Sequence, residues 1–411
     1  MRMTDTRREP RMDALANAGA AAVVQLPYPG EPFGIAYPLP VPDFGCVYLW
    51  ADGKGYTGRA KELVLERELA HSRYQRSLGF IQHYQRKGVP LADAQARLHT
   101  AKPQADMESV QLMQSLRESL LAGEDAALAV ARFRMERIGW REAFLWGVAL
   151  TKPAAPVSSL HPPFNQLSLS MAQQPPEAWE SLVQQAQQER LLVRGESLIT
   201  AQTIQQAMEQ PAPVLDSLMS HLREALTLYR GRIRYWEIIS DLPHSLHPFA
   251  HERKALLSLV GTLCEAASAV DFGIVRLLGV SYSLHARCAA FDLLNYLVEN
   301  GVPFEGVHLH LDWRDFDLLD LDWVVEHYGD LGKPLHVTLH PPPANPDEAE
   351  GFFWHAPANA AIQAEWLQCT LTLAMSKPFI VGAQVALDAV ADSTIQHLQE
   401  QRRVWKSCPT P

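Results

Sequence analysis

Two histidines, His308 and His310, lie two residues apart in an apolar segment, 306–311, whose composition is typical of a β-strand. Successive side chains of a strand leave on opposite faces, so these two leave on the same face. A carboxylate from a neighbouring strand would complete a two-histidine, one-carboxylate site for a divalent transition metal. Asp241 or Glu196, each of which follows a strand-like segment, could be that carboxylate. The predicted metal ligands are His308, His310 and Asp241.

The same residues also suit proton transfer without a metal. Asp241 would act as a general acid or base, and His308 or His310 beside it would shift its pKa. The predicted catalytic residues are therefore Asp241, Glu196, His308 and His310. Two alternatives stay open: the histidines only form hydrogen bonds in a polar pocket, or the polar groups merely satisfy one another. Glu237 is expected on the other face of its strand, in a structural role.

From about residue 144 onward, short apolar strands alternate with amphipathic helices. The predicted strands are 144–149, 191–194, 235–239, 273–278, 306–311, 335–339 and 379–385. Such alternation predicts βα units with right-handed crossovers and a parallel sheet. With one further strand, these units would close into an eight-stranded (β/α)8 barrel, an α/β fold. An open doubly wound sheet is the alternative, but no glycine-rich phosphate loop follows any of the strands.

The chain divides into four segments by composition. Residues 1–26 contain arginines and only a weak, alanine-rich apolar stretch, which indicates a disordered leader rather than a secretory signal. Residues 27–140 begin with short strands and turns and continue as paired helices. Residues 141–400 form the predicted barrel, and 401–411 a tail.

Charge and cysteine content narrow the class of protein. The net charge is −10 with no basic run, which argues against a nucleic-acid partner. The five cysteines are scattered with no CxxC pair, a pattern typical of reduced thiols in the cytoplasm. Because no run of about 20 apolar residues occurs, we expect no membrane span. The sequence therefore predicts a cytoplasmic protein, and it leaves the oligomeric state open.

Five segments occur in the order that they have in glycoside hydrolase family 10, the retaining endo-xylanase barrels, and the chain resembles that family. The segments are LVRG at 192–195, YWEIISD at 235–241, GVPFEGVHLH at 301–310, GKPLHVT at 332–338 and SKPFIVG at 376–382. The resemblance covers roughly 144–388 and implies a (β/α)8 barrel. It also places Glu196, Asp241, His308, His310 and His340 at the barrel mouth.

The departures from the family pattern concern its two catalytic carboxylates. The family's acid/base glutamate corresponds to Asp241, and its nucleophile to Leu339, which is followed by His340. Retaining hydrolysis needs two carboxyl groups about 5–5.5 Å apart. Ordinary xylanase chemistry is therefore not expected of this chain.

Further residues could contact a ligand at the mouth. Asn165 aligns with the family's substrate-binding strand, Trp236 belongs to the segment that resembles its fourth strand, and others follow predicted strands. The predicted substrate-binding residues are Asn165, Trp236, Tyr282, His285, Arg287, Trp313 and His340.

We read the chain as a barrel repurposed to act on an intracellular small molecule or saccharide. An unusual glycosidase on a soluble oligosaccharide is one alternative, with Asp241 as the acid and water or the substrate as the nucleophile. A non-catalytic carbohydrate-binding or scaffold protein is the other, because one barrel fold serves many functions. A divalent transition metal is the one cofactor that the residues suggest, and no nucleic acid or membrane is expected as a partner.

Overall fold

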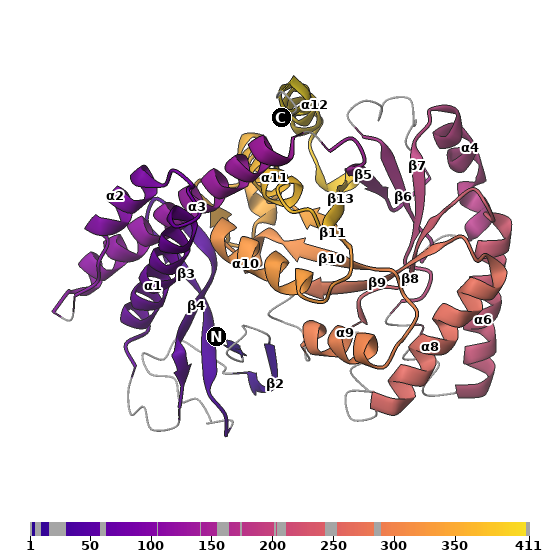
Figure 1. Ribbon diagram of the computed structural model, residues 1–411, viewed down its shortest axis with the longest axis horizontal. Coiled ribbons are helices and arrows are strands. Elements are labelled where there is room, and N and C mark those ends of the chain that lie inside the picture. Colours follow the sequence, from indigo (N-terminus) through magenta and orange to yellow (C-terminus); the bar gives the residue numbers. More distant parts are fainter. Residues whose placement is uncertain are drawn as a thin grey trace.

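Eight parallel strands close into a barrel in which each strand pairs with the next along the chain (Figure 1). The computed structural model describes residues 2–4, 10–15, 30–57, 63–104, 106–139, 141–153, 164–172, 175–200, 203, 211–242, 253–282 and 289–407. The barrel strands are β5 (Leu145–Leu150), β6 (Gln166–Ser170), β7 (Leu192–Glu196), β8 (Tyr235–Ile239), β9 (Val275–Tyr282), β10 (Gly306–Asp312), β11 (Leu335–His340) and β13 (Ile380–Ala386). Pairing of β13 with β5 closes the ring. The predicted (β/α)8 barrel is confirmed.

The strand that the sequence did not reveal is β6. Its residues, QLSLS, alternate polar and apolar over a short length and include no β-branched side chain. The neighbouring strands hold it in place, since Gln166 is in register with Gly147 on one side and with Leu192 on the other.

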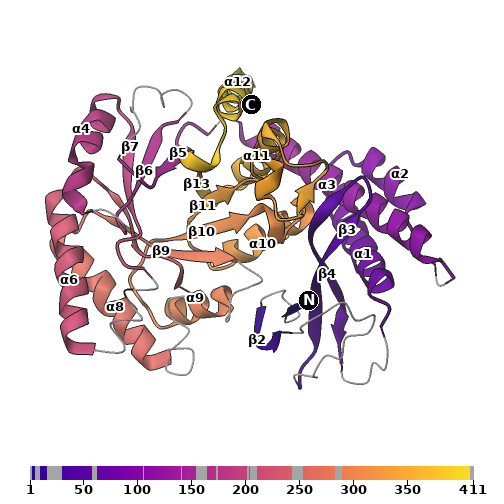
Figure 2. The ribbon, with the colours of Figure 1, turned by 180° about the vertical axis from the view of Figure 1, so that it is seen from behind.

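Helices cover the outside of the barrel, as seen from both sides in Figures 1 and 2. They are α4 (Glu180–Gln188), α6 (Pro211–Leu228), α8 (Arg253–Val270), α9 (Ala290–Glu299), α10 (Leu318–Gly329), α11 (Ala360–Met375) and α12 (Asp392–Ser407). Outward-facing strand residues pack against them and form the main hydrophobic core. None of the helices within the described residues is long and apolar enough to cross a membrane.

The N-terminal region forms an antiparallel sheet covered by helices, beside the barrel (Figure 2). Its elements are β1 (Arg2–Thr4), β2 (Pro10–Leu15), β3 (Phe33–Val41), β4 (Gly45–Tyr56), α1 (Leu65–Gln85), α2 (Ala92–Thr100) and α3 (Ser109–Ile138). A short strand of the barrel part, β12 (Phe353–Trp354), pairs with β4 and completes this sheet. Gly45 permits the close approach, because a Cβ there would lie 2.5 Å from the Phe353 carbonyl oxygen. The two parts therefore share a sheet.

Two observations bear on the ends of the chain. β1 and β2 lie within 1–26, where the sequence predicts a disordered leader, and β1 pairs with β3. At the other end, α12 continues to Ser407, into the segment expected to be a tail.

Candidate functional site

Polar side chains fill much of the barrel interior, where branched apolar residues are usual. Those contributed by the strands are Gln166, Ser168, Arg194, Glu196, Glu237, His308, His336, Thr338 and Gln384, and all are buried. Gln384 Nε2 donates to Glu196 Oε1 at 2.6 Å and to Thr338 Oγ1 at 2.8 Å. Its Oε1 accepts from Ser168 Oγ at 2.6 Å. Since β13 is not a neighbour of β6 or β7, these contacts cross the barrel and place the side chains inside it.

His308 is fully buried in this interior and makes two short contacts through Nε2. Arg194 Nη2 lies 2.6 Å from Nε2, and Thr338 Oγ1 lies 2.6 Å from it as well. A guanidinium can only donate, so Nε2 accepts and the ring proton is assigned to Nδ1. That Nδ1 faces Glu237 Oε2 at 3.2 Å. Burial, and then the charge of Arg194, hold the pKa of His308 well below its usual value, so the ring is neutral.

Glu237 points into the barrel, whereas the sequence led us to expect it on the other face of β8. It is fully buried, and its Oε2 also accepts from the backbone N–H of Ser197 at 3.3 Å. Gly279 on β9 leaves room for it, because a Cβ there would lie only 1.7 Å from Oε1. The preceding residue, Trp236, faces the helices, so strand alternation sends Glu237 inward.

His310 and His340 stack at the C-terminal ends of β10 and β11. Their ring centroids are 5.6 Å apart, and Nδ1 of His310 lies 3.3 Å from Nε2 of His340. The other ring nitrogen of His310 faces Glu237 Oε1 at 3.9 Å. Burial, and then the charge of His310, lower the pKa of His340 to about 4. His340 is therefore neutral at neutral pH and can accept a proton.

Leu339, the position that aligns with the family nucleophile, faces away from the interior. Thr338 and His340, on either side of it, contact side chains inside the barrel. By alternation Leu339 points toward the helices, where it is buried. His340 thus holds the inward-facing place at the end of β11.

A pocket of about 400 Å³ lies at the C-terminal ends of β9, β10 and β11, and we call it the mouth pocket. It is lined by Tyr48, Ser281, Tyr282, His310, Asp312, Arg314, Asp315, His340, Glu350 and Phe352. Active sites of (β/α)8 barrels lie at this end of the strands, and the volume is in the range of small-molecule sites. Tyr48 belongs to β4, so the N-terminal sheet forms part of the wall.

Next to the histidines, the wall carries a charged pair and a buried acid. Arg314 donates from Nε and Nη2 to the two carboxylate oxygens of Asp312, both at 3.0 Å. Asp315, at the end of the 3-10 helix Trp313–Asp315, is only 4% exposed. Burial, and then the charge of Asp312, raise the pKa of Asp315 well above its usual value. The pocket therefore combines an ion-paired carboxylate with a carboxyl group that favours its neutral form.

The predicted catalytic residues divide between the interior and the mouth. Glu196 and His308 lie in the buried interior, and His310 lines the mouth pocket. Asp241 follows β8 in the left-handed backbone region, with φ 50°, which is strained for a residue that has a Cβ. The carboxylate whose oxygen lies within 4.8 Å of nitrogens of both histidines is Glu237, not Asp241.

The predicted substrate-binding residues are more scattered. Tyr282 and His340 line the mouth pocket, and Trp313 borders a second hollow of about 520 Å³ that shares Arg314 with it. Two others lie away from the mouth. Asn165 binds the backbone of Phe144 and Trp146 at the N-terminal end of β6. Trp236 is buried beside Tyr229, outside the barrel. His285 and Arg287 lie outside the described residues.

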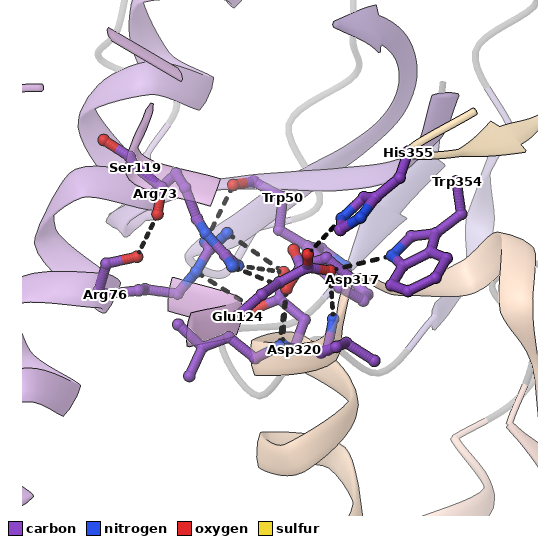
Figure 3. A network of polar contacts seen from close by, with 12 residues as sticks. Trp50, Arg73, Arg76, Ser119, Glu124, Asp317, Asp320, Trp354 and His355 are labelled. Carbon is purple, nitrogen blue, oxygen red and sulfur yellow. Dashed lines mark hydrogen bonds and ion pairs between the residues drawn. The ribbon is translucent and has the colours of Figure 1, made fainter. Parts of the chain in front are cut away.

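A buried network holds two segments of the mouth against the N-terminal helices (Figure 3). Glu124 of α3 accepts from the backbone N–H of Leu318 and from Trp354 Nε1, both at 3.1 Å. Its other oxygen lies 2.6 Å from His355 Nε2. Leu318 starts α10, shortly after the pocket residues Asp312–Asp315 in the chain, and Trp354 and His355 shortly follow Glu350 and Phe352. Glu124 therefore positions both segments.

Arg73 of α1 reinforces the same junction. Its guanidinium lies 2.7 Å from Asp317 and 3.1 Å from Asp320, and all three side chains are buried. Asp317 also accepts from the backbone N–H groups of Leu319 and Asp320, which caps the N-terminus of α10. Because breaking a buried ion pair leaves an uncompensated buried charge, these contacts hold the N-terminal end of α10 against α1.

Glu237, His308 and His310 form the one group of possible metal ligands found among the described residues. A histidine that binds a metal normally donates a hydrogen bond from its other ring nitrogen. Arg194 donates to that nitrogen of His308, which puts the ring proton on Nδ1, the atom that would have to face the metal. The cluster thus has suitable residue types, but the proton on His308 is in the wrong place.

The comparisons with known proteins bear on the fold. No protein-family model matches the sequence, and neither does any curated protein. Solved structures that resemble the chain include xylanase 10B from Thermotoga maritima, at 13% identity and a TM-score of 0.48, covering 67% of this chain and 98% of that one. A psychrophilic family 10 endo-β-1,4-xylanase matches at 13% and 0.47, covering 64% of this chain and 99% of that one.

The endo-β-1,4-mannanase from Thermotoga petrophila matches at 10% identity and a TM-score of 0.46, covering 65% of this chain and 78% of that one. These are weak likenesses, with TM-scores below 0.5, and neither a family nor an activity follows from them.

Proposed function

We propose that the mouth pocket binds a small neutral saccharide, or a polar metabolite of similar size, and acts on it by proton transfer. The observation that carries the proposal is the neutral His340 in the wall of an otherwise charged and aromatic pocket. A neutral imidazole is a proton acceptor at physiological pH. Tyr282 and Phe352 supply aromatic surface, and the Asp312–Arg314 pair supplies acceptors and donors for hydroxyl groups.

This function differs from retaining hydrolysis because it uses no carboxylate nucleophile. Leu339 and His340 replace the nucleophile, so we propose a repurposed barrel rather than a xylanase. The thiols of Cys46, Cys264 and Cys369 are free, in keeping with an intracellular ligand. An unusual glycosidase and a non-catalytic binding protein are the other outcomes of the test below.

The alternative function of the interior cluster of Glu237, His308 and His310 is to bind a divalent transition metal. Glu237, His308 and His310 have the residue types for it, and such a metal would supply Lewis-acid activation of water or of the ligand. The contact from Arg194 to His308 favours the metal-free state, so the proposal assigns no step to a metal.

The test is a reaction screen on the full chain. Neutral mono- and disaccharides and 4-nitrophenyl β-xyloside are incubated with the protein, and products are followed by proton NMR and by nitrophenol release. His340→Gln is compared with His99→Gln, a change at an exposed histidine on α2. We expect turnover that survives in His99→Gln and is lost in His340→Gln. Nitrophenol release would make the protein an unusual glycosidase, and binding without turnover would make it a binding protein.

A further inference from the structure

Asp315 is a buried acid in the wall of the mouth pocket. It is 4% exposed, and among the described residues none forms a hydrogen bond with its carboxyl group. Asp315 nevertheless belongs to the lining of the pocket. Burying a polar group without a hydrogen-bonding partner is unfavourable, and it is far more unfavourable if the group is charged. Such a group in a pocket wall is positioned for a ligand.

The neighbouring acid on the same loop has the opposite environment. Asp312 accepts hydrogen bonds from Nε and Nη2 of Arg314, and also from the Arg314 backbone N–H at 2.9 Å. Arg314 is thereby engaged by Asp312, and Asp315 receives no comparable contact. The two carboxyl groups of this loop therefore differ in their partners. Burial and the charge of Asp312 raise the pKa of Asp315, and Arg314 opposes them only in part.

We propose that Asp315 is the proton donor of the mouth pocket, and that it gives its proton to an oxygen atom of the ligand. The proposal rests on the function proposed above and adds the second half of its chemistry. The O–H bond of Asp315 breaks as a bond forms between its proton and a hydroxyl, glycosidic or carbonyl oxygen of the ligand. Solvent returns a proton to Asp315 after the ligand leaves.

The same geometry defines the ligand class. A neutral carboxyl group donates to an electron-rich oxygen, whereas an ammonium group offers only hydrogens and would ionise it. The other charged or titratable groups that line the pocket near Asp315 are Asp312, Arg314, Glu350, His310, His340, Tyr48 and Tyr282. The pocket therefore selects a neutral, hydroxyl-rich molecule over an amine.

The first part of the test measures the proton on Asp315 directly. The full chain, labelled with ¹³C at the aspartate carboxyl carbons, is titrated by NMR, and the Asp315 signal is the one lost in Asp315→Asn. Asp347→Asn, a change at an exposed aspartate, is the matched control. We expect the assigned carboxyl to lose its proton only well above the usual range of an aspartate. An Asp315 that ionises near pH 4 overturns the donor role.

The second part uses xylobiose and cellobiose as neutral probes and glucosamine as the amine. We expect the disaccharides to bind the wild type, to bind Asp315→Ala at least tenfold more weakly, and to bind more tightly than glucosamine. Where a probe turns over, the fall in rate at high pH should disappear in Asp315→Asn. If neither disaccharide binds, both proposals fail. If they bind equally to the wild type and to Asp315→Ala, the donor role alone fails.

Discussion

Replacing Glu124 by alanine should lower the unfolding free energy, because it removes contacts between the N-terminal helices and the mouth of the barrel. The carboxylate accepts from the Leu318 N–H and from Trp354 Nε1, and it pairs with His355 at 2.6 Å. Each buried donor left without a partner costs about 1–3 kcal/mol, and breaking a buried ion pair costs about 3–5 kcal/mol. Because contacts that share one carboxylate are not additive, we expect a total loss of about 3–5 kcal/mol.

The assay is urea unfolding of the full chain, followed by tryptophan fluorescence. Glu136→Ala, at an exposed position of the same helix, should stay within about 0.5 kcal/mol of the wild type. If Glu124→Ala costs no more than Glu136→Ala, the network does not join the two parts and the reasoning fails.

The cost should also depend on pH, because His355 titrates in the network. Burial lowers its pKa, but the hydrogen bond and the charge of Glu124 outweigh burial and raise the pKa above 6.5. The contribution of a group with a raised pKa is fully present below its unfolded value and is lost as the pH rises through its folded value. The difference between wild type and Glu124→Ala should therefore be larger at about pH 6 than at about pH 9. A constant difference would contradict the ion pair.

Three further predictions concern the barrel. Gly279→Ala places a Cβ against Glu237 and should lower the unfolding free energy by about 1–3 kcal/mol. Gly261→Ala on α8 has open space around it and should not lower it, and thermal unfolding of both variants tests the difference. Elemental analysis of the purified chain should find no stoichiometric transition metal, and a full equivalent that raises the melting temperature would show that the tautomer of His308 was misassigned. Lys377→Met should cost about 3–5 kcal/mol in denaturant unfolding, because it leaves Asp322 buried without its cation at 2.6 Å; a loss below about 1 kcal/mol would refute this.

The barrel could be predicted because its signal is local. Each predicted strand is a short apolar run followed by a helical pattern, and this alternation alone defines parallel βα units. β6 could not be predicted, because QLSLS has neither a long apolar run nor β-branched residues. Its neighbouring strands hold it in place.

The site could be predicted only in part, because its contacts cross the barrel. His308 and His310 were correctly placed on one strand, but nothing in the sequence indicates that Arg194, on a non-neighbouring strand, donates to His308. Glu237 had a usable signal: it lies four residues before Asp241, and strict alternation would put both on one face. A register shift between Glu237 and Ile239 then breaks that alternation, so Asp241 does not join the histidines.

Other parts of the mouth had no sequence signal. Tyr48 reaches the pocket because β12 joins the N-terminal sheet, and this pairing depends on the tertiary fold. Asp315 stands in a polar loop sequence that is typical of a solvated loop, whereas the structure buries it.

The most direct test of the mouth pocket as a saccharide site is a calorimetric titration of the full chain with xylobiose and with cellobiose. Arg314→Met removes the charged group that the mouth pocket shares with the neighbouring hollow, and His99→Gln is the control. We expect one binding site in the wild type and in His99→Gln, and at least a tenfold loss of affinity in a folded Arg314→Met. No binding heat with either disaccharide, or equal affinity in all three proteins, would contradict the account.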